Sequence, residues 1–468
     1  MSIFPGALSL AMVACAVSLA SADQLLVGFA EQDITPEVGP NKRAVWLAGY
    51  GFGRKATGIH DRLMARAVVL SYGGDKVAIA SVDLIGLQND VVLRIREQLA
   101  GFRHVTVAST HNHEGPDVIG IWGPTPIQRG VSEDYLKLVI QQVVAAIRLA
   151  EKNAVPATAA FGTAEDDSLL DDSRKPLAKD GALRTLKFST AEGRTAGLLV
   201  QWNCHPESLG SRNTLITADF PWATVQWLKK QHDCPVVYIS GAVGGLMGPP
   251  DNRIRDSEGK ILGDGDFEYA RLLGEEVGKL ADKAIAAAAP IRLTPFNVAA
   301  KRIAVPVSNR IYRLGRQTGV LKREGRIWLG EPEKFGEVVV DAKPGSELAI
   351  VSEVSCLRLG ELSIVNLPGE LYPELVYGKF QEPADPAADF PEAPLEPTVA
   401  ELMPTDKWLL FGLASDELGY IIPKRQWDEQ SPFCYDRPKS QYGEINSCGP
   451  ETAPVLMQAL SECVRALK

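Results

Sequence analysis

The sequence lacks several patterns that would point directly to a function: paired cysteines, basic clusters and long apolar runs. Its 468 residues include seven cysteines, none with the C-x-x-C spacing of a cysteine-based zinc site. No cluster of Lys and Arg interrupts a chain with a net charge of -9 and a pI near 5.4, which argues against nucleic acid as a partner. After residue 22 no stretch reaches the about 18 consecutive apolar residues of a membrane span. Internal repeats and heptad arrays are also missing.

The N-terminal stretch is apolar and ends in small residues. Ala20 and Ala22 form an A-x-A-like cleavage signal after a run of the length of a signal-peptide core, although no Lys or Arg precedes that run. Cys15 offers the alternative of a lipoprotein-like acylation site, but Met12 fits such a signal poorly. We therefore predict a signal peptide at residues 1–22, a mature chain that begins at Asp23, and a secreted or periplasmic location.

Removal of the signal peptide leaves six cysteines, an even number that allows disulfide bonds in an exported protein. Cys434 and Cys448 lie in a stretch rich in Pro and Gly that lacks the pattern of regular secondary structure. A disulfide bond would stabilise such a stretch, so this pair is the predicted bridge.

The hydrophobic pattern predicts a mixed α/β fold (α+β mixed). Up to about residue 291 strand-like and helix-like segments alternate: strands are expected at 76–84, 105–109, 194–203 and 234–245, and helices at 133–152, 219–231 and 267–289. After Pro290 alternating apolar positions and turn residues favour β-structure. Residues 382–405, rich in Pro, Glu and Ala, are expected to form an exposed long loop, and 452–467 a helix that docks on the body. We expect one catalytic domain over 23–468, with an α/β first half and a β-rich second half.

The stretch STHNHEGPD places two histidines directly after a predicted strand. His111 and His113 are two residues apart, so in an extended segment their side chains point the same way. The carboxyl ends of strands are where α/β sheets usually carry their chemistry. An ordinary polar loop explains the same pattern, because histidine is both the commonest metal ligand and a frequent surface residue.

Three further residues follow apolar segments in the same way: His205 in NCHPES, Glu370 in NLPGE and Tyr420 in SDELGY. Histidine and carboxylate are the ligands that a catalytic zinc ion prefers, with one position left for water. The alternative is structural, with His205 as a loop cap, Glu370 as a solvated turn residue and Tyr420 as half-buried core. Because these residues are far apart in the sequence, their spacing alone does not show that they form one site.

Seven strings occur in an order that resembles the neutral/alkaline non-lysosomal ceramidase family: GFGRKATGIHDRLMARAVVL, ASVDLIGL, STHNHEGPD, NCHPESLG, ISGAVGG, NLPGELYPEL and LASDELGYIIP. The resemblance runs from about Val27 to Pro450 and implies a secreted or surface zinc amidase of sphingolipid metabolism that hydrolyses the N-acyl bond of ceramide. It implies Zn²⁺ as the cofactor. The implied zinc ligands are His111, His205, Glu370 and Tyr420, and the implied catalytic residues are His113, Arg174 in DDSRKPL and Tyr442 in QYGE.

The chain departs from the family pattern at two places that bear on the site. The family usually has a second tyrosine three residues before Tyr420, where this chain has Glu417, which leaves Glu417 as an alternative ligand. The family's glycine-rich loop reads GDVS. In this chain we align Gly245 with the aspartate of that loop and Met247 with its serine. A thioether offers none of the chemistry of a hydroxyl. We also expect no counterpart of the family's C-terminal immunoglobulin-like domain.

The leading hypothesis is a zinc-dependent hydrolase of a linear amide bond (EC 3.5.1 class), with metal-activated water as nucleophile and a lipid-like or small N-acyl substrate. In that hypothesis His113 passes a proton to the leaving amine and Arg174 holds the oxyanion or the substrate. The first alternative keeps the metal and changes the substrate to another amide or an ester. The second is an exported ceramidase-like binding protein without turnover, favoured by Gly245 and Met247.

Overall fold

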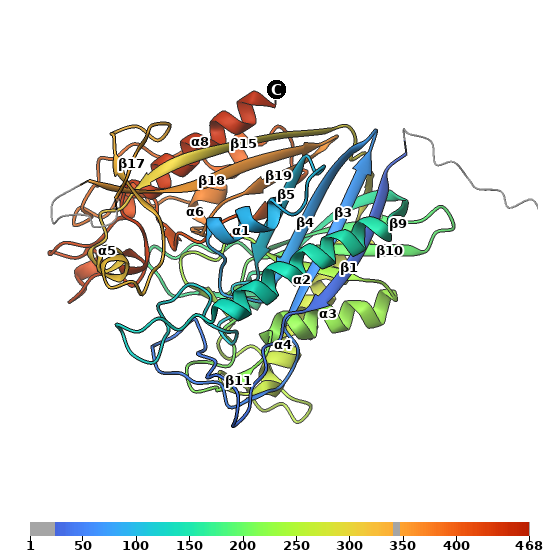
Figure 1. Cartoon of the computed structure of the whole chain (residues 1–468), viewed down its shortest axis with the longest axis horizontal. Helices are drawn as coiled ribbons and strands as arrows, with labels where there is room; N and C mark the ends of the chain where they lie inside the picture. Colours follow the sequence, from blue (N-terminus) through green and yellow to red (C-terminus); the bar gives the residue numbers. More distant parts are fainter. Residues whose placement is uncertain (1–23, 340–346, 468) are drawn as a thin grey trace, which may run out of the picture.

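The computed structural model describes residues 24–339 and 347–467. The predicted signal peptide and Cys15 lie outside these ranges. Within them the chain folds into three large β-sheets with helices on their outer faces, as Figure 1 shows, and three two-stranded sheets. No helix in this part of the chain combines the length and the apolar composition needed to cross a membrane. The predicted mixed α/β class is confirmed.

The first sheet comes from the N-terminal third of the chain. Its spatial order is β5 (His104–Ser109), β4 (Asp75–Val82), β3 (Met64–Tyr72), β1 (Leu26–Asp33) and β6 (Val155–Pro156). β4 and β5 run parallel, whereas the other neighbours are antiparallel. Helix α2 (Glu133–Lys152) begins after Ser132, whose hydroxyl accepts from the Tyr135 N–H. Its apolar stripe lies across this sheet, in front of the blue strands of Figure 1.

The second sheet packs face to face on the first. Its order is β12 (Val236–Ser240), β10 (Thr195–Trp202), β9 (Ala182–Ser189), β7 (Thr158–Glu165) and β14 (Ala289–Ile291). Side chains along β10 alternate: Leu199 points to the first sheet, and Leu198 and Val200 point to helices α3 (Asp219–His232) and α4 (Phe267–Ala286). The two sheets approach closely at Gly197, where a Cβ atom would lie 2.4 Å from the Phe29 ring.

The third sheet uses the second half of the chain, as predicted. Its order is β17 (Phe335–Val339), β16 (Gly325–Trp328), β18 (Leu348–Leu359), β19 (Leu362–Asn366) and β21 (Trp408–Phe411), with β15 (Phe296–Pro306) also paired to β18. The predicted C-terminal helix, α8 (Thr452–Ala466), packs on β15 and β18. Ile364 and Phe411 of this sheet join the core between the first two sheets, so the three sheets share one interior.

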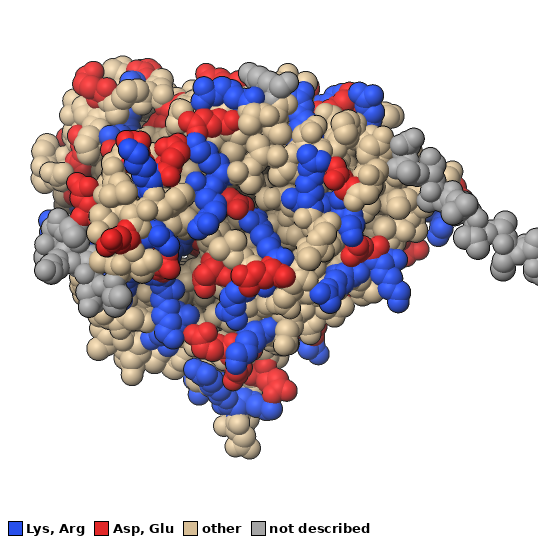
Figure 2. All heavy atoms as spheres, turned by 45° about the horizontal axis from the view of Figure 1, so that its top comes forward, with Lys and Arg blue, Asp and Glu red and all other residues tan. Residues whose placement is uncertain are grey.

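Short elements complete the described structure. They are β2 (Gly58–Ile59), β8 (Asp171–Asp172), β11 (Leu215–Ile216), β13 (Met247–Gly248), β20 (Glu370–Leu371), β22 (Tyr420–Ile421), α1 (Asn89–Arg96), α5 (Arg310–Gln317), α6 (Glu374–Tyr377), α7 (Val399–Leu402) and the 3-10 turns Asp167–Leu169, Lys424–Gln426, Cys434–Asp436 and Glu444–Asn446. Helix α7 interrupts the predicted loop 382–405, because Thr398 and Glu401 form a reciprocal capping box there. The surface seen in Figure 2 intersperses Lys and Arg with Asp and Glu and presents no large area of one sign.

The predicted Cys434–Cys448 disulfide bond is wrong. Both cysteines are buried and free. The Cys448 thiol donates to the Leu418 carbonyl oxygen (3.5 Å), and the backbone N–H of Cys434 donates to the Asp428 carboxylate (3.0 Å). Each half of the irregular stretch is therefore held by its own hydrogen bonds, which the sequence pattern does not reveal.

Candidate functional site

The ends of strands from all three large sheets are bonded to one another at a common edge of these sheets. The N–H of Ser109, at the end of β5, donates to the Leu413 carbonyl (3.2 Å). The Ser240 hydroxyl, at the end of β12, donates to the Thr110 carbonyl (2.7 Å), and the N–H of Gly412 donates to the Ser240 carbonyl (3.0 Å). Segments that are far apart in the sequence are thus fixed side by side just before their candidate site residues.

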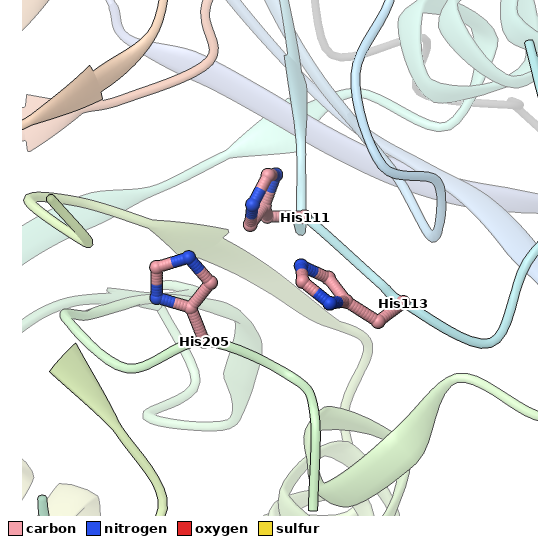
Figure 3. A group of neighbouring side chains, drawn as sticks. All are labelled: His111, His113 and His205. Carbon is pink, nitrogen blue, oxygen red and sulfur yellow. The ribbon is translucent and has the colours of Figure 1, made fainter. Parts of the chain in front are cut away.

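Three histidines meet at this edge. Figure 3 shows His111, His113 and His205 with their rings turned toward a common space. One nitrogen atom of each lies within 4.8 Å of the others, and all three side chains are buried. His111 adopts a φ of 67°, which a residue other than glycine rarely does. Unusual backbone of this kind concentrates at functional sites, because only a strongly determined structure retains it.

Two of the imidazoles have a fixed orientation. Nδ1 of His111 lies 2.7 Å from the Ile85 carbonyl oxygen, and Nδ1 of His205 lies 2.9 Å from the Met247 carbonyl oxygen. A carbonyl oxygen only accepts, so Nδ1 carries the proton in both rings and Nε2 presents a lone pair in the neutral form. Both Nε2 atoms point at the Glu370 carboxylate, at 3.4 Å from His111 and 3.0 Å from His205.

Glu370 and the two Nε2 atoms therefore bring three lone pairs to one place, an arrangement that requires a cation between them. In the metal-free protein that cation is a proton. Burial would lower the pKa of His205, but the hydrogen bond to Glu370, the negative charges of Glu207 and Glu370 and the bond to the Met247 carbonyl together outweigh burial and raise that pKa to about 9. Burial likewise opposes ionisation of Glu370, yet His111 and His205 lower its pKa to about 2. This donor set fits a divalent metal ion that prefers imidazole and carboxylate.

His113 differs from the other two histidines because neither of its ring nitrogens has a hydrogen-bond partner. Burial, together with His111 and His205, holds its pKa well below the usual value, so the ring is neutral. The ring packs edge-on against Tyr50, with centroids 5.1 Å apart. Its backbone is fixed by Arg54, which donates to the His113 carbonyl, and by the Pro206 carbonyl, which accepts from the His113 N–H (3.2 Å).

An apolar cavity of about 150 Å³ leads to this group. Its polar end carries His111, His113, Glu370, Glu417 and Tyr420, and its apolar walls include Ile85, Ile119, Ile121, Trp122, Ile311, Leu321, Leu418, Tyr442 and Ile445. Several wall residues are open to solvent at the mouth, with Ile311 61% and Tyr442 52% exposed. His205 is only 1% exposed and contacts Glu370 without lining the cavity.

Tyr420 and Glu417 both reach the cavity, so the structure leaves both as candidates for the fourth ligand. Tyr420 pairs with Glu370 across the parallel strands β20 and β22, which places the two side chains on one face. Its ring lies 6.5 Å from that of His205 and 6.2 Å from that of Tyr442. One oxygen of Glu417 accepts from the Gly419 N–H (2.8 Å), and the other is buried without a partner. Burial and the nearby Glu370 raise the pKa of Glu417 well above its usual value.

Arg174 is not among the residues that line the cavity. It is 2% exposed, and its guanidinium donates to Glu444 (2.5 Å) and to the Gln426 carbonyl oxygen (3.1 Å). The same group lies over the Tyr372 ring, 4.8 Å from the centroid. This is the environment of a buried ion pair, and the role of Arg174 on the substrate stays a prediction.

The loop after β12 contributes to the candidate site through its backbone. The Met247 side chain is fully buried in the core, and its carbonyl oxygen binds His205. The residue of this loop that adjoins Glu370 is Gly244, where a Cβ atom would lie 2.6 Å from the Glu370 carbonyl oxygen. Compared letter by letter with GDVS, the tetrapeptide GAVG puts Ala242 and Gly244 at the aspartate and serine, rather than Gly245 and Met247. In either register the serine hydroxyl is missing.

Sequence reasoning missed Glu207 and the two carbonyl groups that orient the histidines. Oε2 of Glu207 lies 3.7 Å from Nδ1 of His113. Glu207 comes two residues after His205 in NCHPES, and this adjacency was the only local signal. The carbonyl groups of Ile85 and Met247 leave no signal, because every residue has one.

Gly49 leaves the space that the His113 ring occupies. It has a φ of 94°, and a Cβ atom there would lie 2.4 Å from Cγ of His113. Gly49→Ala is therefore expected to displace the ring and to lower the catalytic efficiency of any reaction at this site by about 10- to 100-fold. Gly51→Ala is the matched control, because a Cβ atom at Gly51 meets nothing within 4 Å. Steady-state kinetics of the two variants test this, and equal activity in both would contradict it.

Fold and site together define a mixed α/β protein with a candidate metal centre where the ends of its strands meet. Residues 25–233 match the family model described as neutral/alkaline non-lysosomal ceramidase, N-terminal. The resemblance inferred from the motifs is therefore confirmed over these residues.

Solved structures extend the similarity to nearly the whole chain. A crystal structure of neutral ceramidase from Pseudomonas aeruginosa superimposes with a TM-score of 0.69 and 16% sequence identity, over 95% of this chain and 74% of that one. A structure described as ceramidase complexed with C2 gives a TM-score of 0.67 and 17% identity, over 95% of this chain and 75% of that one. At such identities the likeness establishes the fold.

Proposed function

We propose that this protein is an exported, zinc-dependent hydrolase of the amide bond in an N-acyl substrate. The observation that carries the proposal is the apolar cavity that ends on the Nε2 lone pair of His111 and the Glu370 carboxylate. A ceramidase-family region over residues 25–233 supports the reaction class. Export rests on the sequence of residues 1–22.

Zinc suits this set of donors better than magnesium or calcium, which prefer oxygen ligands. His111, His205 and Glu370 would hold the ion, with Tyr420 or Glu417 as the fourth group. A bound Zn²⁺ supplies activation of water and polarisation of the amide carbonyl. Loss of the serine hydroxyl at Gly244 or Met247 is compatible with this chemistry, because the nucleophile is water rather than a side chain.

The chain's own residues would orient the substrate and move a proton. The apolar walls bind an acyl chain and exclude water from the reacting bond. His113 is neutral at neutral pH, so it can accept a proton from the attacking water and return it to the leaving amine. The exposed apolar mouth around Ile311 and Tyr442 favours a lipid-like substrate over a small polar amide.

The experiment combines metal analysis with a substrate panel. Purified protein is expected to contain about one zinc per chain, and a His111→Ala/His205→Ala double variant is expected to contain almost none. His232→Ala is the control, because His232 pairs with Asp282 away from the cavity. N-acyl substrates of increasing chain length, from ceramide to short amides, are expected to show turnover that rises with apolar length. Stoichiometric zinc in the double variant would refute the metal site.

A different amide or ester is the first alternative, and rapid turnover of ceramide in detergent micelles would count against it. The second alternative is a binding protein, favoured by the missing hydroxyl at Gly244. It predicts that wild type binds long-chain N-acyl compounds and releases no amine from any member of the panel. It also predicts that Met247→Ser brings no turnover.

A further inference from the structure

We infer that Glu207 positions His113 by accepting a hydrogen bond from its Nδ1–H. The inference rests on the proposed function for its catalytic consequence, but its geometric basis is independent of the substrate. Oε2 of Glu207 lies 3.7 Å from Nδ1 of His113, and a small rotation of the carboxylate brings it to hydrogen-bond length.

The backbone on both sides of this contact is fixed. The N–H of His113 donates to the carbonyl of Pro206, the residue before Glu207 (3.2 Å). The Tyr50 hydroxyl donates to the Glu207 carbonyl oxygen (3.0 Å), while the Tyr50 ring packs against the His113 ring. The distance between the Glu207 and His113 backbones is therefore set by three contacts, and only the carboxylate remains adjustable.

Glu207 is the one carboxylate within 4 Å of a His113 ring nitrogen among the described residues. Glu370 contacts His111 and His205 instead. Glu114, the other carboxylate on this side, is engaged by Arg54 (3.1 Å) and by the Asn213 amide (2.8 Å). Both nitrogens of His113 are buried and otherwise unpartnered, which is costly for a polar group. A bond from Nδ1–H to Glu207 relieves that cost for one of them.

The bond would select one tautomer of His113. With the proton on Nδ1, the lone pair of Nε2 is free to act at the cavity end. A carboxylate behind an imidazole also raises the basicity of that ring, whether the ring transfers a proton or binds a metal. Each of the three histidines would then have an acceptor at Nδ1: Ile85 for His111, Met247 for His205 and Glu207 for His113.

Nitrogen NMR of the histidine rings tests the inference without any substrate. The chain has six histidines, so ¹⁵N-histidine labelling gives few signals, and a His113→Gln variant assigns the one of interest. In metal-free wild type, His113 is expected as the Nδ1–H tautomer. Glu207→Ala is expected to shift it toward the Nε2–H tautomer that free imidazole side chains favour. Glu207→Gln, which keeps an acceptor oxygen, is expected to retain the Nδ1–H form.

Kinetics supply the second readout. Glu207→Ala is expected to lower kcat by about 10- to 100-fold with little change in KM or zinc content, and Glu207→Gln to lose less. Glu192→Ala is the control, since that side chain is 68% exposed, lies in the turn between β9 and β10 and does not line the cavity. An unchanged His113 tautomer in Glu207→Ala would overturn the inference, as would kcat within about two-fold of wild type. A wild type that hydrolyses no substrate would refute the proposed function alone, because the tautomer still decides the role of Glu207.

Discussion

Glu370→Gln is expected to abolish metal binding while leaving the fold intact. Glutamine keeps the shape of glutamate but removes the charge that faces both Nε2 atoms, so the metal affinity should fall by at least about 100-fold. Hydrolysis should fall at least as strongly, because the metal supplies the nucleophile. The glutamine NH₂ group can donate to the lone pairs of His111 and His205, which lie 3.4 Å and 3.0 Å from Oε2 of Glu370.

The metal-free form should therefore unfold with a free energy within about 1 kcal/mol of metal-free wild type. Calorimetric titration with zinc measures the affinity, and denaturant unfolding measures the stability. Glu374→Gln is the matched control, because Glu374 is equally buried in the next segment but does not line the cavity. Wild-type zinc affinity in Glu370→Gln would contradict the assignment of this carboxylate as a ligand.

The sequence pattern predicted those helices and strands in which buried residues recur at a regular spacing along the chain. Helix α2 carries an apolar stripe and a serine cap, and β10 alternates between two covered faces. Helix α5 was not predicted, since none of its residues is buried and its start depends on the Asn309 side chain. The pairing of β15 with β18 over eleven residues joins segments some fifty residues apart, and a sequence does not display such a register.

In the candidate site, too, local sequence predicted some residues and long-range contacts determined the rest. His111 and His205 each come directly after a buried strand, and the sheets bring those strand ends together. The cavity lining agrees with the predicted positions of Glu370, Tyr420 and Tyr442, although their roles stay predictions. The sequence could not reveal what the distant residues contribute: the partner of Arg174 is Glu444, 270 positions later. Long-range ion pairs of this kind have no local signature.

Arg174→Ala is expected to destabilise the protein strongly, whether or not Arg174 also acts on a substrate. Removing the guanidinium leaves Glu444 buried without its cation, which costs about 3–5 kcal/mol in comparable buried pairs. The stacking on Tyr372 and the hydrogen bond to the Gln426 carbonyl are lost as well. Denaturant unfolding should show a lower midpoint with an unchanged slope.

The double variant Arg174→Met/Glu444→Gln separates structure from catalysis. Removing both charges removes the unpaired carboxylate, so this variant should recover much of the stability that Arg174→Ala loses. If Arg174 serves only the fold, the double variant should also recover hydrolysis. If Arg174 reaches the substrate, stability returns and hydrolysis does not, because a thioether cannot donate to an oxyanion. The ion-pair geometry favours the first result, and a stable Arg174→Ala variant with lost activity would contradict it.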